Sequence, residues 1–199
     1  MIKAVIFDFG GVILRTEDHT PRRNLEARLS LEPGQSEALV FFSEMGQQAQ
    51  GGAITESALW AWIKEQLRLD CDGLVDFMAA FWSGDVLDRD LEAAIRRLRP
   101  RYQTAMISNA MDGLRSDLEE KWQIADAFDL IVVSAEEQVM KPDAEIFQRT
   151  LARLGRRPEE CVFVDDSLDN VQAARDWGLA TVHVRPGTDV PGELKEILS

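Results

Sequence analysis

Five short apolar runs along the chain predict the strands of a buried sheet. The first extends from Ile2 to Phe7 and is interrupted soon afterwards by Gly10 and Gly11. The other four lie in the second half of the chain, and they are Thr104–Ile107, Leu130–Val133, Val162–Val164 and Ala180–Val184. Continuous apolar runs of this length, rich in β-branched residues, are typical of parallel strands covered on both faces.

Segments with helical spacing of apolar residues separate the later runs. Gly155 and Gly178 follow two of these segments, at positions where helices commonly end. Strands that alternate with helices predict an α/β fold, namely a Rossmann-like parallel sheet of about five strands with helices on both faces. The helical positions are Leu91, Ile95 and Leu98, then Leu114, Leu118 and Trp122, then Ile146, Phe147, Leu151 and Leu154, then Val171, Ala174 and Trp177.

The segment from Arg15 to Asp90 has a different pattern, because it contains no strand run. Its apolar residues recur at helical spacing, as in Leu59, Ile63 and Leu67. We therefore predict a core domain formed by residues 1–14 and 91–199, and a helical-bundle cap domain formed by residues 15–90 and inserted after the first strand.

Composition and charge narrow the class of protein. The chain has 199 residues, of which 45% are hydrophobic and 29% are charged, as in ordinary globular proteins. Its net charge of −13 repels nucleic acids, so we expect none as a partner. No apolar stretch is long enough to span a membrane. Cys71 and Cys161 match no metal-binding spacing, and so few cysteines favour a cytoplasmic location. We expect a monomer or a dimer.

Polar residues follow the predicted strands at the points where the strands end. Asp8 follows the first run, Ser108 and Asn109 follow the second, Lys141 comes a few residues after the third, and Asp165-Asp166 follows the fourth. Each residue alone is a common turn or capping residue. Because the carboxyl ends of parallel strands share one edge of the sheet, we expect these groups to meet in one crevice, where ligands bind.

The chemistry of this set favours phosphoryl transfer. Several carboxylates in one crevice repel one another unless a divalent cation lies among them, and oxygen-only ligands favour Mg²⁺. The metal and Lys141 can neutralise a phosphate, while Ser108 and backbone amides hold its remaining oxygens. A carboxylate nucleophile can then form an aspartyl-phosphate. Lys141 can also pair with Asp8 and Asp165 when no substrate is bound.

Four segments resemble the sequence motifs of the haloacid dehalogenase-like (HAD) superfamily, in the same order. They are Ile6–Ile13, Ile107–Asn109, Met140–Asp143 with Ile146-Phe147, and Val164–Asn170 with Ala173-Ala174 and Gly178. Together they span nearly the whole predicted core, and the helical insert follows the first motif, where such enzymes carry a small helical cap. The chain is similar to the subgroup that contains the bacterial α-D-glucose-1-phosphate phosphatase.

The resemblance implies a set of metal ligands. Asp8 would be both the nucleophile and a ligand, and the backbone carbonyl of Gly10 would be a second ligand. Asp166 would be the third, with Asp165 beside it or just behind it. Asn170 stands where many relatives have another acid.

The resemblance also implies the phosphate-binding residues. Ser108 and Asn109 would bind the phosphate, and Lys141 would hold both the nucleophile and the substrate. The substrate would be a small-molecule phosphate ester.

One position departs from the pattern of the superfamily. Most of its phosphatases have an aspartate two residues after the nucleophile, which protonates the leaving oxygen, but this chain has Gly10. A general acid–base contributes about 10²- to 10⁴-fold in rate. Three consequences are open: a substrate with a better leaving group, such as a sugar 1-phosphate or an acyl phosphate; another group that substitutes; or slow turnover.

The expected function is that of a Mg²⁺-dependent phosphatase of small phosphorylated metabolites such as sugar phosphates. Two alternatives stay open. One is a 2-haloacid dehalogenase, which uses the aspartate without a metal; the acidic pair Asp165-Asp166 argues against it. The other is a binding or regulatory protein with a catalytically weak site, and Gly10 is its main support.

The cap should select the substrate. The segment Gly46–Ala53 is predicted as a flexible, uncharged loop, and its glutamines could offer amides to sugar hydroxyls; a plain solvent-exposed loop is the alternative. The tryptophans Trp60, Trp62 and Trp82 are predicted to form the core of the cap in preference to a stacking surface.

Overall fold

Five parallel strands form the main sheet, in the spatial order β5-β4-β1-β6-β7. The computed structural model describes every residue from Met1 to Ser199. All five predicted runs are strands, and their ends agree with the prediction to within two residues. The bounds are β1 Ala4–Phe7, β4 Gln103–Ser108, β5 Leu130–Val133, β6 Cys161–Asp165 and β7 Ala180–His183.

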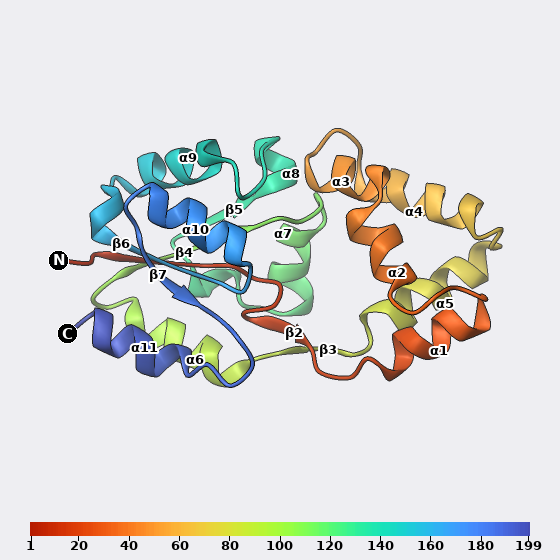
Figure 1. Cartoon of the computed structure of the whole chain (residues 1–199), viewed down its shortest axis with the longest axis horizontal. Coiled ribbons are helices and arrows are strands. Elements are labelled where there is room, and N and C mark those ends of the chain that lie inside the picture. Colours follow the sequence, from red (N-terminus) through yellow and green to blue (C-terminus); the bar gives the residue numbers. More distant parts are fainter.

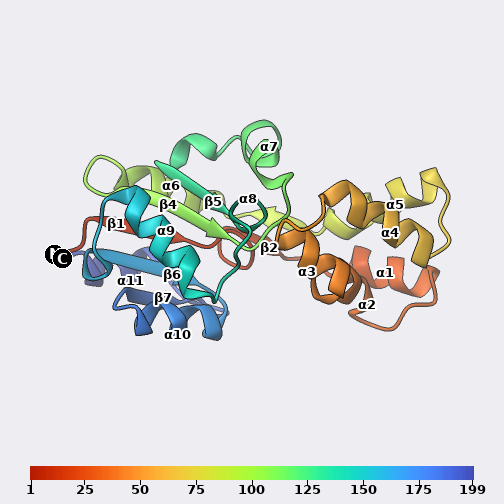
Figure 2. The same ribbon diagram turned by 90° about the horizontal axis from the view of Figure 1, so that it is seen from above.

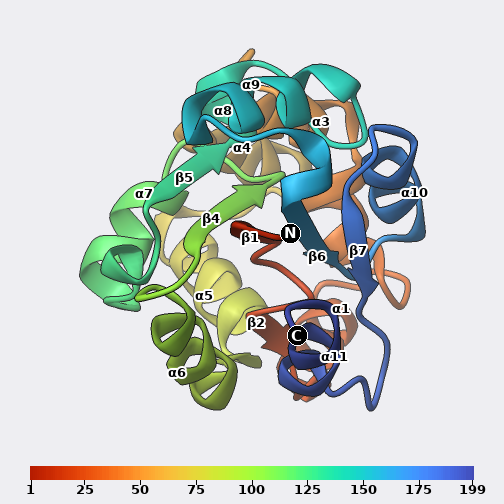
Figure 3. The ribbon, with the colours of Figure 1, turned by 90° about the vertical axis from the view of Figure 1, so that its left-hand side faces the viewer.

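Helices cover both faces of this sheet (Figure 3), as predicted. Alternate residues of β1 point to opposite sides: Val5 and Phe7 belong to one apolar cluster, and Ala4 and Ile6 belong to another. Helices α6 (Arg89–Leu98) and α11 (Val190–Ile197) contribute to the first cluster. Helices α9 (Ala144–Leu154) and α10 (Leu168–Asp176) contribute to the second. The α/β fold with two covered faces is therefore confirmed.

Capping residues set the ends of these helices. The carboxylate of Asp88 accepts a hydrogen bond of 2.8 Å from the backbone N–H of Leu91 at the start of α6. Gly155 ends α9 in the left-handed conformation, with φ of 65°, as predicted. The shorter elements of the sheet unit are α7 Leu114–Ser116, the π-helix η2 Asp117–Lys121, the 3-10 helix η3 Ala125–Ala127, α8 Ser134–Glu137 and the 3-10 helix η4 Pro158–Glu160.

A second, helical unit lies beside the sheet unit (Figure 1). Its elements are α1 Thr20–Arg28, α2 Gln35–Glu37, the π-helix η1 Ala38–Phe42, α3 Glu44–Gln50, α4 Glu56–Gln66 and α5 Cys71–Trp82. It has an apolar core of its own, in which Leu59, Ile63, Phe77 and Phe81 are fully buried. That this unit behaves as a separate domain bounded at residues 15 and 90 stays a prediction.

Two short strands connect the units, and they correct the prediction that residues 15–90 contain no strand. Strand β2 (Leu14–Thr16) pairs antiparallel with β3 (Asp85–Leu87). Three residues are too few to show a strand periodicity, and the pairing exists because the two ends of the insert return to the same place. The carboxylate of Asp85 accepts hydrogen bonds from Thr16 Oγ1 at 2.6 Å and from Arg22 at 2.8 Å, which fix this connection.

The helical unit also contacts the sheet unit away from these strands. The Ser134 hydroxyl donates a 2.6 Å hydrogen bond to the carbonyl of Gln50, at the end of α3. The N–H of Glu56 donates to the carboxylate of Asp112 at 2.9 Å. Figure 2 shows α3 beside α8 at this contact. The two units therefore enclose the carboxyl edge of the sheet between them. None of the helices is both long enough and apolar enough to cross a membrane.

Candidate active site

The site lies where the strand order of the sheet reverses. From β1 the chain proceeds to β4 and β5 on one side, and it then returns to β6 and β7 on the other. In open parallel sheets, ligands bind at the carboxyl ends of the strands at such a point. Asp8 directly follows β1, and Asp165 is the last residue of the neighbouring β6. The Asp8 N–H donates to the Val164 carbonyl at 2.8 Å, which keeps the two carboxylates side by side.

Lys141 bridges these two carboxylates. Its ammonium nitrogen lies 2.7 Å from Asp8 Oδ1 and 2.7 Å from Asp165 Oδ2. The side chains of Lys141 and Asp165 are almost completely buried. Because a buried charge is costly unless it is paired, each member of this trio depends on the others. The predicted pairing of Lys141 with Asp8 and Asp165 is confirmed.

Asp165 is fixed by further hydrogen bonds. Its Oδ1 accepts from the N–H of Ser167 at 2.8 Å. The side-chain amide of Asn170 donates to both carboxylate oxygens, at 3.1 and 3.2 Å. Asn170, whose role the sequence leaves open, is therefore an internal partner of Asp165. These contacts restrict Asp165 to one orientation, with its second oxygen directed at Lys141.

Asn109 is bound to the backbone of Lys141. Its amide group donates to the Lys141 carbonyl at 2.8 Å, and its carbonyl oxygen accepts from the Lys141 N–H at 2.8 Å. Both ends of the side chain are therefore engaged. The predicted contact of Asn109 with phosphate stays a prediction, and its side-chain amide group holds Lys141 in place.

Three carboxylates form a group that suits a divalent cation. Asp8, Asp165 and Asp166 each offer an oxygen, and these atoms lie within 4.8 Å of one another. Burial raises the pKa of Asp8 from 3.8 to about 7; the charge of Lys141 opposes the shift, and that of Asp165 adds to it. Burial, reinforced by the charge of Asp165, also raises the pKa of Asp166. The cluster holds more negative charge than Lys141 alone balances, so a cation stabilises it.

The two consecutive glycines after Asp8 have different surroundings. Gly11 has a φ of 76°, and a β-carbon there would lie 2.1 Å from Asp166 Oδ2. Only glycine allows the loop to pass so close to that carboxylate. A β-carbon on Gly10 would meet no atom within 4 Å, so the space beside Gly10 is open. The Gly10 carbonyl as a metal ligand stays a prediction.

Ser108 ends β4 and faces a cavity of about 340 Å³, which Gly10 and Asn109 also line. Residues of the helical unit form the opposite wall of this cavity. The structure thus brings Ser108 and Asn109, two of the three predicted phosphate-binding residues, to the wall of a pocket between the units, whereas Lys141 does not line it. Strand edges alone could not reveal this pocket, because five of its sixteen lining residues come from the insert.

The predicted loop at Gly46–Ala53 is wrong in its first part. Gly46 to Gln50 belong to α3, whose first turn is capped by the Ser43 hydroxyl. The uncharged sequence does not indicate this helix. The helix is stabilised by the Ser43 cap and by the burial of Ala49 in the core of the helical unit. Gln47 is exposed, whereas Gln50 is buried and lines the cavity.

The family model of the haloacid dehalogenase-like hydrolases matches residues 2–178 of the chain. The chain belongs to this family. A sesquiterpene phosphatase of Aspergillus oryzae, astK, is 26% identical over 98% of this chain and 96% of its own length. The bifunctional epoxide hydrolase 2 of Sus scrofa is also 26% identical over 98% of this chain, which spans 39% of that enzyme.

The fold is shared with solved structures of the same family. A HAD family enzyme of Bacteroides thetaiotaomicron, in complex with magnesium and inorganic phosphate, superimposes with a TM-score of 0.81 at 23% identity. The match covers 96% of this chain and 98% of that enzyme. At this level of identity the likeness is one of fold.

Proposed function

We propose that the protein is a Mg²⁺-dependent phosphatase of small phosphate monoesters, with Asp8 as the nucleophile. The observation that carries this proposal is the trio in which Lys141 bridges Asp8 and Asp165, placed beside Asp166 and the pocket at Ser108. The names of relatives agree with it. One is a sesquiterpene phosphatase, another is an N-acylneuraminate-9-phosphatase of Rattus norvegicus, and the solved relative from Bacteroides thetaiotaomicron holds magnesium with phosphate.

The donor set suits Mg²⁺. Asp8, Asp166 and the Gly10 carbonyl would hold the ion, with Asp165 beside them, and all of these donors are oxygens, which Mg²⁺ prefers. When bound, Mg²⁺ supplies positive charge that offsets the three carboxylates and the phosphate oxygens. Lys141 supplies the protein's own positive charge at the same point.

The reaction proceeds in two displacements in this proposal. An oxygen of ionised Asp8 attacks phosphorus, and the bond from phosphorus to the ester oxygen breaks. The departing alkoxide takes its proton from water, because Gly10 offers no acid. Water then attacks the aspartyl-phosphate, which releases inorganic phosphate and restores Asp8. Lys141 remains beside Asp8 and holds its carboxylate in place throughout.

A panel of phosphate monoesters, assayed for released phosphate with Mg²⁺ and with EDTA, tests the proposal. We expect release that requires Mg²⁺ and that falls at least about 10³-fold in Asp8→Asn. Asp72→Asn, on the exposed first turn of α5, is the matched control and should keep full activity. Release that survives in Asp8→Asn, or that EDTA leaves unchanged, would contradict the proposal.

The same assays address the two alternatives. Chloride release from 2-chloropropionate in EDTA would identify a dehalogenase. No turnover of any ester, with a melting temperature that Mg²⁺ and phosphate still raise, would identify a binding protein with a weak site. Sugar phosphates belong in the panel as the substrates that the sequence predicts.

A further inference from the structure

The cavity between the two units includes Ser108 and Asn109, which are predicted to bind the phosphate. Gly10, Ser108 and Asn109 line it on the side of the sheet, and α5 and η1 of the helical unit close it on the other. Its volume of about 340 Å³ lies at the small end of the range for ligand pockets. A phosphate held at Ser108 would therefore have its ester group in this cavity.

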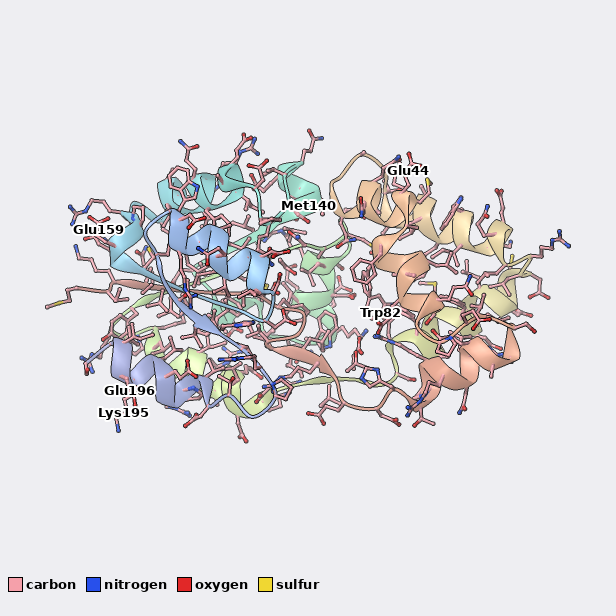
Figure 4. All side chains as sticks on the ribbon, viewed as in Figure 1. Glu44, Trp82, Met140, Glu159, Lys195 and Glu196 are labelled. Carbon is pink, nitrogen blue, oxygen red and sulfur yellow. The ribbon has the colours of Figure 1, made fainter.

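Aromatic side chains from both units form the walls. Phe9 and Trp122 of the sheet unit contact each other with ring centroids 5.0 Å apart. Phe41 and Trp82 of the helical unit contact each other at 5.9 Å, and Met78 lies on the same wall. Trp82, predicted as part of the helical core, is half-buried and lies on the side of its unit that faces the sheet (Figure 4).

The two polar side chains that the helical unit contributes to the cavity have partners within the protein. The amide nitrogen of Gln50 donates to the carbonyls of Phe41 and Gly46, at 2.8 and 3.2 Å. A carboxylate oxygen of Glu56 accepts from the indole N–H of Trp60 at 2.9 Å. The amide nitrogen of Gln50 and one carboxylate oxygen of Glu56 are therefore held by internal partners, which reduces what they can offer to a sugar.

On the side of the sheet unit, the ammonium of Lys121 lies 4.7 Å from the centre of the Trp122 ring, which favours the charge. A sugar placed between these walls would lose hydrogen bonds to water and regain few of them. An apolar group would instead remove its own surface and that of the aromatic walls from water.

The open space beside Gly10 also favours an apolar ester group in this cavity. Apart from its two chain neighbours, no residue has an atom within 4 Å of the position that a β-carbon of residue 10 would occupy, and Gly10 itself lines the cavity. The region that an acidic side chain would fill is thus free, and it adjoins the cavity that the aromatic residues line.

We propose that the preferred substrates are phosphate esters of apolar alcohols. The pocket that recognises them lies between two aromatic pairs, Phe9 with Trp122 and Phe41 with Trp82. The proposal rests on the phosphatase function and narrows it to a substrate class. The alcohol would be of a size that fits the cavity, with few or no hydroxyl groups beyond the esterified one.

Cyclohexylmethyl phosphate and glucose 6-phosphate make a matched pair of probes. Both are primary alkyl esters with a six-membered ring, so their leaving groups are similar and they differ chiefly in ring hydroxyls. We expect kcat/KM for cyclohexylmethyl phosphate to be at least about tenfold higher. Equal values, or a preference for glucose 6-phosphate, would overturn the proposal and leave the phosphatase function intact.

Pocket variants test the location. Trp82→Ala and Trp82→Gln should lower the ratio of the two kcat/KM values several-fold, whereas a loss of folded protein lowers both values equally and leaves the ratio unchanged. Trp177→Ala, at the exposed end of α10, is the matched control. An unchanged ratio in both Trp82 variants would place the recognition of the alcohol elsewhere and overturn the assignment of this pocket.

Binding separates this proposal from the function on which it rests. In Asp8→Asn with Mg²⁺, tryptophan fluorescence should report tighter binding of cyclohexylmethyl phosphate than of glucose 6-phosphate, because Trp82 and Trp122 line the pocket. That preference without turnover in the wild type would refute the phosphatase function alone. Equal affinities would refute the substrate class.

Discussion

Asn109 and the backbone of Lys141 form two reciprocal hydrogen bonds of 2.8 Å, although 32 residues separate them in the chain. The side chain of Asn109 thereby ties the end of β4 to the segment that carries the central ammonium group. Since Lys141 in turn bridges Asp8 and Asp165, this one amide helps to position the ammonium group between the two carboxylates.

Removal of this amide should reduce catalysis more than substrate binding. In Asn109→Ala the N–H and carbonyl of Lys141 lose their partners, and the ammonium group shifts relative to Asp8. We expect kcat to fall about 10- to 100-fold with a smaller change in KM. Asn109→Asp keeps the acceptor for the Lys141 N–H, so its kcat should lie between those of the wild type and of Asn109→Ala. The exposed Asn24→Ala is the control. A change confined to KM would instead indicate that Asn109 acts on the substrate.

Substitution of the two glycines after Asp8 should have opposite consequences. Gly11→Ala places a β-carbon where Asp166 Oδ2 lies and forces alanine into a left-handed conformation, so Asp166 must move. The Mg²⁺ concentration for half-maximal activity should rise at least about tenfold. Gly10→Ala meets open space and should keep the Mg²⁺ response of the wild type. Titrations of activity and of melting temperature with Mg²⁺ measure the response of each variant. Identical curves for the two variants would refute the assignment of Asp166 as a metal ligand.

The charge of Asp8 should destabilise the metal-free protein at neutral pH. Its pKa is raised from 3.8 to about 7 in the folded state, chiefly by burial. Between these values the folded state holds a proton that the unfolded state has released, so stability falls as the pH rises through this window. In EDTA, Asp8→Asn should therefore melt at a higher temperature than the wild type at pH 8, and the difference should vanish near pH 4.

Saturating Mg²⁺ should reverse that order, because the wild type gains more from the bound ion. Asp72→Asn should follow the wild type under every condition, since the residue is exposed. A pH-independent gap between Asp8→Asn and the wild type in EDTA would show that ionisation of Asp8 is not its cause.

The contact between the units should depend on Ser134. Its buried hydroxyl donates to the Gln50 carbonyl at 2.6 Å and accepts from the Ala110 N–H at 2.9 Å. Ser134→Ala leaves the Gln50 carbonyl and the Ala110 N–H without this hydroxyl. The loss should lower the free energy of unfolding by about 1–3 kcal/mol. KM should rise as well, because the pocket lies between the units. Denaturant unfolding and kinetics measure this, with the exposed Ser57→Ala as the control; an unchanged KM would mean that the pocket does not depend on this contact.

Much of the fold follows from local patterns in the sequence. Apolar runs such as Leu130–Val133 predict strands because both faces of a parallel sheet are covered. Asp8, Ser108 and Asp165 could be placed together because each one ends or directly follows a strand, and the carboxyl ends of parallel strands share one edge. Side-chain packing is not needed to bring Asp8, Ser108 and Asp165 to one crevice, because the strand ends alone place them there.

Only the tertiary structure decided the partners within the site and the nature of the pocket. The pairing of Asn109 with Lys141 and that of Asn170 with Asp165 depend on side-chain directions, which a strand pattern does not specify. The strands β2 and β3 exist because the ends of the insert meet. Trp82 has the helical spacing of a core residue, yet it faces the cavity, because the docking of one unit on the other determines which surface of a helix remains open.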